Sequence, residues 1–166
     1  MATRRTKDET GPRAWGGLLA VHADLVPVLD RQLQRSSGLP LVWYDVLLEL
    51  NGAEDGRLRM GELGDRVVLS RSRVSRLVDE LADAGLVTRT SNPADGRSAY
   101  AEITTVGRAR LRAAAPVYLA GIREHFSQYL TAAELDVLAT ALWRVHAAHQ
   151  RNAVAFSRRS TAARPT

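Results

Sequence analysis

Hydrophobic residues recur with a helical period along most of the chain. Apolar side chains spaced three and four residues apart predict a long first helix from Ala14 to about Gln34. Further helices are predicted at 40–52, 59–67, 70–84 and 105–130. A last helix follows Thr131-Ala132-Ala133-Glu134, which has the form of a capping box. The pattern is typical of a mainly helical protein.

The period changes after Gly85, a residue suited to ending a helix in the left-handed conformation. Residues 86–90 and 98–103 have the pattern of short strands, and the segment 91–97 between them is rich in turn residues. This predicts a β-hairpin with an extended loop. The predicted order is four helices, a hairpin and two helices.

The helices at 59–67 and 70–84 have the spacing of a helix-turn-helix. A tight turn around Val68-Leu69 joins them, Gly64 is small where they approach, and Ser70 is a good N-cap for the second helix. The inward positions of the second helix are Val74, Leu77, Val78 and Leu81. Helical geometry then turns outward Ser72, Arg73, Arg76 and Asp79, with Ser75 on the shoulder.

The outward face of this second helix changes charge along its length. Its N-terminal half carries serines and arginines, with Arg71 in the first turn, and its C-terminal half carries Asp79, Glu80 and Asp83. DNA repels carboxylates, so the helix is expected to enter a major groove by its N-terminal end. A solvated charged surface is the alternative for such a helix taken alone. The helix-turn-helix spacing and the hairpin behind it favour DNA binding.

Composition narrows the possible functions. A net charge of +5 suits a polyanionic partner, and the absence of cysteine excludes disulfides and thiol chemistry. No apolar run is long enough to span a membrane, and the N-terminus lacks the apolar region of a secretory signal. We therefore expect a cytoplasmic protein without a membrane partner. The polar, basic ends at 1–13 and 157–166 are expected to be disordered.

Catalytic and metal-binding patterns are weak in this sequence. No nucleophile–base arrangement or phosphate-cradling glycine loop stands out, so no enzyme activity, catalytic residue or cofactor is predicted. His146 and His149 are three residues apart and could bind zinc with His125, but no cysteine or nearby acid completes the set. No metal site is predicted.

Several motifs between Leu63 and Gly107 together resemble the MarR family of bacterial transcriptional regulators. The matching pieces are Val74-Ser75-Arg76-Leu77-Val78-Asp79-Glu80-Leu81, Gly85-Leu86-Val87-x-Arg89, Asp95-x-Arg97 and Ile103-Thr104-x-x-Gly107. With the flanking helices, the resemblance covers roughly residues 14–150.

The resemblance implies a fold and an assembly. A single domain at 14–156 would hold a winged helix-turn-helix at about 41–104 and dimerisation helices from both ends, at about 14–35 and 105–156. The homodimer would present two recognition helices to double-stranded DNA, about one helical turn apart, and would act as a repressor on a palindromic operator. The alternative is an architectural protein that binds DNA with little sequence preference.

The resemblance also implies which residues contact DNA. Arg97 at the wing tip would enter the minor groove, and Asp95 would hold the wing by pairing with Arg97 or Arg89. The expected DNA-binding set is Ser70, Arg71, Ser72, Arg73, Ser75, Arg76, Asp95 and Arg97.

Many members of the family bind a small aromatic or phenolic effector between the dimer helices and the DNA-binding lobe. The residues expected to line such a pocket are Trp15, His22, Trp43, Tyr44 and Asp45. The alternative is that Trp43 and the apolar residues around it belong to the core.

Overall fold

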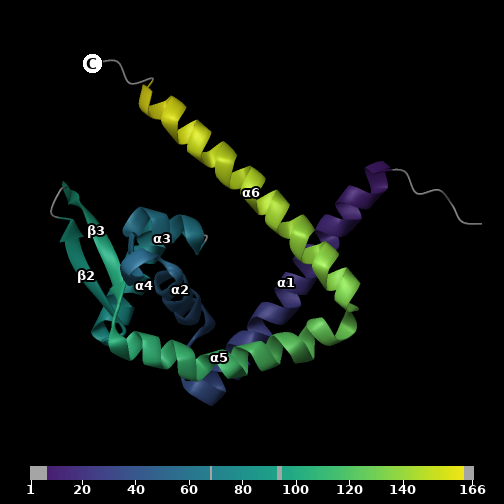
Figure 1. Cartoon of the computed structure of the whole chain (residues 1–166), viewed down its shortest axis with the longest axis horizontal. Coiled ribbons are helices and arrows are strands. Elements are labelled where there is room, and N and C mark those ends of the chain that lie inside the picture. Colours follow the sequence, from purple (N-terminus) through teal and green to yellow (C-terminus); the bar gives the residue numbers. More distant parts are fainter. Residues whose placement is uncertain (1–6, 68, 93–94, 163–166) are drawn as a thin grey trace, which may run out of the picture. The chain divides into compact units, whose positions relative to one another are not determined.

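The computed structural model describes residues 7–67, 69–92 and 95–162, without the side chains of 7–8, 71, 92, 95–98 and 150–162. The chain forms two compact units, Met1–Ile122 and Arg123–Thr166. The elements are α1 (Lys7–Ser37), α2 (Leu41–Gly52), η1 (Glu54–Gly56), β1 (Arg57–Arg59), α3 (Met60–Arg66), α4 (Arg71–Asp83), β2 (Val87–Asn92), β3 (Asp95–Ile103), α5 (Thr105–His125), η2 (Ser127–Tyr129) and α6 (Ala132–Ala162). Figure 1 labels the six α-helices and the strands β2 and β3.

The first unit is built on a hydrophobic core under the sheet. Leucines and valines of α2, α3 and α4 fill its centre, and Leu33 of α1 and Leu111 of α5 close it from the flanks. None of the described residues after Ile122 belongs to this core. The first unit ends at this point, and the expectation of a single domain over 14–156 stays a prediction.

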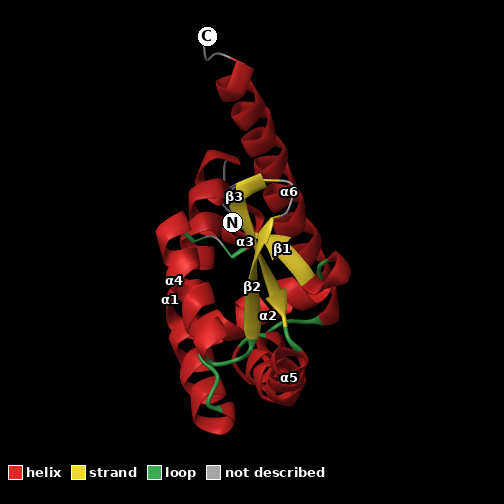
Figure 2. Ribbon diagram, turned by 90° about the vertical axis from the view of Figure 1, so that its left-hand side faces the viewer, coloured by secondary structure: helices red, strands yellow, loops and turns green. Residues whose placement is uncertain are grey.

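The sheet has three antiparallel strands in the order β1-β3-β2 (Figure 2). The predicted hairpin is confirmed as β2 and β3, but its strands reach further than expected. The prediction of a loop over 91–97 is wrong for Ser91, Asn92 and 95–97, because ladder pairing overrides their turn propensity. Strand β1 was not predicted, because three residues with a single buried side chain, Leu58, show no recognisable period.

The helix-turn-helix is confirmed. Helices α3 and α4 lie next to each other, and a Cβ added at Gly64 would come within 3.3 Å of Val74 Cγ2. The amide of Leu69 donates to the carbonyl oxygen of Gly64, which closes the turn. Gly85 has a φ of +70°, the left-handed conformation expected after α4.

The two terminal helices are longer than the apolar stripes that predicted them. Helix α1 begins at Lys7, so the expected disorder is wrong for 7–13, and α6 continues to Ala162, so it is wrong for 157–162. Lys7, Glu9 and Arg13 are good helix formers, as are the arginines of 157–162, but α1 also takes in Gly11 and Pro12, which are poor ones. The rest of the expected disordered ends, 1–6 and 163–166, lies outside the described residues.

In the second unit, the predicted capping box opens α6. The amide of Thr131 donates to Glu134 Oε2 at 2.8 Å, and the amide of Glu134 donates to Thr131 Oγ1 at 3.3 Å. The amide of Thr131, together with its hydroxyl, which lies 2.8 Å from the same carboxylate oxygen, stabilises the charged carboxylate and lowers the pKa of Glu134. Helix α5 ends at His125, earlier than the predicted residue 130, and the single turn η2 follows it.

Candidate nucleic-acid interface

Helix α4 presents a polar face at its N-terminal end. Val74 and Val78 are fully buried, which leaves Ser72, Arg73 and Arg76 exposed and Ser75 half-buried, as the spacing predicts. Ser70 is the N-cap residue, but its hydroxyl makes no capping bond and lies 3.3 Å from that of Ser72 instead. Two hydroxyls and two guanidinium groups are thus turned to solvent within the first half of the helix.

An ion pair joins α4 to the wing. Arg89 Nη1 donates to Asp79 Oδ1 at 2.8 Å and lies 3.4 Å from Ser75 Oγ. Arg89 stands opposite Ala101 in the ladder, on the sheet face that the helices cover, so its side chain reaches α4. Arg89 pairs with Asp79, while its expected pairing with Asp95 involves a side chain outside the described residues and stays a prediction. From its sequence position, Asp79 was expected only to be an acid that DNA repels.

The outer half of the wing is described as backbone only. Asp95 and Arg97 lie in β3, and Arg71 opens α4, but the side chains of all three are outside the described residues. Their expected contacts with DNA, and the pairing of Asp95 with Arg97, stay predictions.

The base of the wing is locked to the end of α4. Thr104 Oγ1 donates to the carbonyl oxygen of Gly85 at 2.8 Å and accepts from the amide of Gly107 at 2.9 Å. A Cβ at Gly107 would overlap the carbonyl oxygen of Leu86 and approach Ile103 Cγ1 to 2.9 Å. The motif Ile103-Thr104-x-x-Gly107 therefore caps α5 and fixes the point at which the wing leaves the helices.

A basic and aromatic cluster on the outer face of the sheet was missed. The guanidinium carbons of Arg57 and Arg59 lie 5.3 Å and 5.9 Å from the ring centre of Tyr100, within the range of cation–π attraction. Arg59 Nε also donates to the Tyr100 hydroxyl at 3.3 Å. The alternation Arg57-Leu58-Arg59 was the available signal, but it is too short to indicate a strand alone.

The five residues expected to line an effector pocket do not form one buried cluster. Tyr44 is buried, and its ring lies 4.8 Å from that of Tyr118. Trp43 packs half-buried against the core. Trp15 and His22 are exposed on α1.

Asp45 is the most perturbed of the five. Burial, followed by the nearby charge of Glu49, raises the pKa of Asp45 to about 6. Burial and the charge of Asp45 also raise the pKa of Tyr44 and of Tyr118. Asp45 is therefore a half-buried carboxyl group whose charge acts on the buried Tyr44 and the half-buried Tyr118.

The described part of the chain holds no group of three residues arranged to bind a metal ion. The ring of His146 packs edge-on against Trp143, with centroids 5.4 Å apart. No helix within the described residues is long and apolar enough to cross a membrane.

A helix-turn-helix followed by an antiparallel wing defines the winged helix-turn-helix class. The chain belongs to the MarR family of transcriptional regulators, whose family model matches residues 37–98. It is similar to Sco3205, a MarR family transcriptional regulator from Streptomyces coelicolor solved in complex with DNA (32% identity, 88% of this chain and 91% of that chain, TM-score 0.75). It is also similar to AbsC, a MarR family regulator from the same organism (33% identity, 90% and 99% coverage, TM-score 0.74).

A curated relative matches over a shorter stretch. The transcriptional repressor YetL of Bacillus subtilis (strain 168) is 33% identical over 86 residues, which are 52% of this chain and 52% of YetL. The match thus spans about half the length of that relative.

Proposed function

We propose that the protein is a sequence-specific, homodimeric DNA-binding regulator of the cytoplasm that represses transcription from a palindromic operator. The observation that carries the proposal is the exposed N-terminal face of α4, where Ser72, Arg73 and Arg76 stand together beside the wing. Hydroxyl and guanidinium groups are the donors that read guanine edges and hold phosphates. The DNA complex of Sco3205 and the repressor name of YetL support the DNA-binding and repressor parts.

The proposed contacts divide between two grooves. The N-terminal half of α4 enters the major groove with Arg73 and Arg76, while Ser70, Arg71, Ser72 and Ser75 bond to phosphates or base edges. The wing reaches the adjacent minor groove with Arg97, where a guanidinium is attracted by the negative potential, and Asp95 orients it.

The homodimer is supported by apolar surface on both terminal helices. Such surface is costly to leave in water and is typical of an association site. The exposed apolar residues are Trp15, Leu18, Leu19, Val21 and Val26 on α1, and Val137, Leu142, Trp143 and Val145 on α6.

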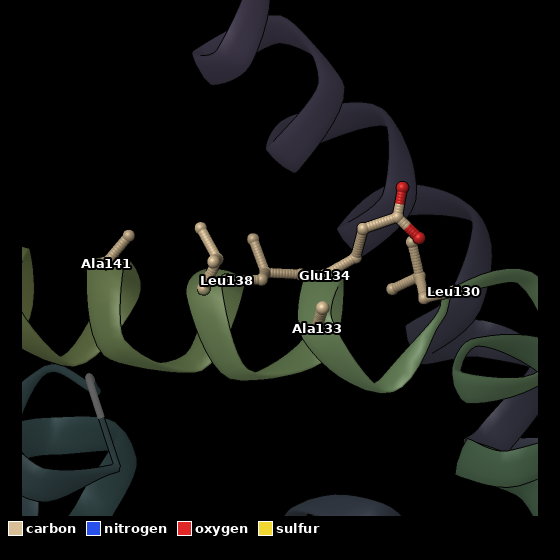
Figure 3. Close-up of a pocket in the computed structure, with 6 residues that line it drawn as sticks. Leu130, Ala133, Glu134, Leu138 and Ala141 are labelled. Atoms are coloured by element: carbon tan, nitrogen blue, oxygen red, sulfur yellow. The ribbon is translucent and has the colours of Figure 1, made fainter.

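Helix α6 also carries an apolar groove of about 480 Å³, shown in Figure 3. It is lined by Leu130, Ala133, Glu134, Val137, Leu138 and Ala141. We propose that a second copy of the chain covers this groove.

We further propose that a small aromatic or phenolic effector modulates DNA binding. Its hydroxyl group would donate to Asp45, and its ring would pack beside Trp43; both residues are half-buried. Trp15 and His22, which are exposed on α1, and the edge of Tyr44 complete the proposed set.

The test is selection of bound fragments from sheared genomic DNA at about 0.15 M salt, near physiological ionic strength. Enrichment of an inverted repeat with half-sites about 10 bp apart supports the proposal. Even recovery without a shared site favours an architectural protein, and no recovery contradicts DNA binding.

Matched double variants make the selection specific for α4. Replacing Arg73 and Arg76 by alanine should abolish the enrichment. Replacing Arg110 and Arg112 by alanine removes the same amount of charge from the exposed surface of α5, and this variant should still enrich the inverted repeat. Equal losses would mean that net charge, and not the face of α4, drives binding.

A further inference from the structure

The ion pair between Asp79 and Arg89 connects the two elements that are proposed to read DNA. Asp79 lies on α4, one turn beyond Ser75 and Arg76 and two turns beyond Ser72, and Arg89 lies on the first wing strand, β2. The 2.8 Å bond between them is the shortest of the ion pairs described between side chains of different elements. Ser75 Oγ, one turn before Asp79, accepts a hydrogen bond from the same guanidinium nitrogen at 3.4 Å.

The exposure of the pair argues against a role in folding. The side chains of Arg89 and Asp79 are 42% and 55% exposed, and ion pairs this exposed contribute little to stability because water screens them. The hydrophobic contacts of Val74, Val78 and Val87 already hold α4 against the sheet. The pair is therefore better placed to set an orientation than to stabilise the fold.

The chemistry of each partner alone would disturb DNA binding. An unpaired Asp79 would repel phosphates from the DNA-facing side of α4. An unpaired Arg89 would be a flexible cation able to contact any phosphate without regard to sequence. Pairing cancels both charges and leaves the donors at the N-terminal end of α4 as the groups that DNA meets.

We infer that Asp79 and Arg89 are positioning residues for sequence recognition. Their bond holds β2 at a fixed distance from α4, so that the major-groove and minor-groove contacts fall on the same half-site. It also suppresses non-specific binding through Arg89. This inference rests on the proposed DNA-binding function and adds the residues that make it selective.

The test is a double-mutant cycle on the ratio of operator affinity to non-operator affinity, with the operator taken from the genomic selection. The variants are Asp79→Ala, Arg89→Ala and the double variant, each measured by fluorescence anisotropy at one salt concentration. Each single variant should lower the ratio about tenfold, the size of one good base contact. The double variant should be no worse than either single one, because the two residues act as a unit.

A matched acid on the same helix provides the control. Asp83→Ala removes the same charge from an exposed position in the last turn of α4. It should raise affinity for both DNAs alike and leave the ratio unchanged. Thermal unfolding should be nearly unchanged in all four variants.

Each other outcome has a defined meaning. Additive effects of the two substitutions would make Arg89 an independent phosphate contact and overturn the inference. If Asp79→Ala, but not Arg89→Ala, changed the base preference at a single operator position, Asp79 would itself contact a base. That result would also overturn the inference. A wild-type protein that does not distinguish the operator would contradict the proposed function itself.

Discussion

At the scale of single residues, the junction between β3 and α5 depends on the absence of a side chain. Thr104 bonds to Gly85, just after α4, and to the amide of Gly107 at the start of α5, where the backbone of Gly107 lies against Leu86. This part of the family motif therefore acts through packing and not through contact with DNA. A change there should alter folding stability before it alters recognition.

Gly107→Ala should lower the free energy of unfolding by about 2 kcal/mol, because the new methyl group overlaps the Leu86 carbonyl oxygen and the Ile103 side chain. Urea denaturation measures the effect. Gly61→Ala is the control, since a Cβ there meets nothing within 4 Å. It should stabilise α3 by up to about 1 kcal/mol. Equal effects at the two positions would show that the contact at Gly107 is relieved without cost.

The carboxyl group of Asp45 couples folding to pH. Burial and the neighbouring Glu49 raise its pKa to about 6, so the folded state binds this proton more tightly than the unfolded chain does. The free energy of unfolding contributed by Asp45 is therefore highest in acid. It falls as the pH rises through the interval between the unfolded and folded pKa values, and the cost is complete above about pH 6.

Asp45→Asn should remove this cost, because an amide has nearly the shape of the protonated acid. We expect a gain of about 1–2 kcal/mol at pH 7, after allowance for the partial exposure of the group. Urea denaturation should show a smaller gain at pH 4.5 than at pH 7. A gain that is independent of pH would contradict an elevated pKa for Asp45.

At the scale of elements, the helix-turn-helix could be predicted because its signals are local. The spacing of Leu63, Val74 and Val78 and the left-handed Gly85 all lie within one stretch of the chain, and the structure confirms them. Ser70 is the N-cap residue as expected, but its hydroxyl makes no capping bond. Strand β1 could not be predicted, because Arg57–Arg59 becomes a strand only by pairing with β3, some forty residues later. The bond between Asp79 and Arg89 was missed for the same reason: it depends on how β2 packs against α4.

Within α4, position along the helix should decide the role of each arginine. Arg76→Ala should lower operator affinity by about 1–3 kcal/mol and relax the preference at one base pair, if its guanidinium reads a base edge. Competition binding against single-base variants of the operator tests this. Arg112→Ala, an exposed arginine on α5, should change neither quantity. An even loss across all sequences would assign Arg76 to a phosphate.

At the scale of the whole molecule, the sequence predicts that a terminal helix has an apolar face, but it does not predict what that face packs against. The apolar stripe from Trp15 to Val26 correctly predicted a helix, but the same stripe is also what a buried core helix would show. Only the structure shows that these side chains are exposed while Leu29 and Leu33 on the same helix are buried. An effector pocket is formed by residues from segments that lie far apart in the sequence. The sequence alone therefore could not decide whether Tyr44 lines a pocket or belongs to the core.

The proposed dimer can be tested by making the same substitution, valine to glutamate, at an exposed position of α6 and at an exposed position of α5. Val137 in the α6 groove and Val106 in the first turn of α5 are 69% and 57% exposed. If a second copy covers the groove, Val137→Glu buries a charge at the interface and should weaken dimerisation about 30-fold or more, the effect of a hot-spot residue. Val106→Glu places the same carboxylate where the helix dipole favours it and should leave the dimer intact. Sedimentation velocity over a concentration series measures both.

Since two recognition helices must act together on a palindrome, Val137→Glu should also lose operator affinity at low protein concentration and recover it at high concentration. A dimer that withstands Val137→Glu would place the interface elsewhere than the α6 groove.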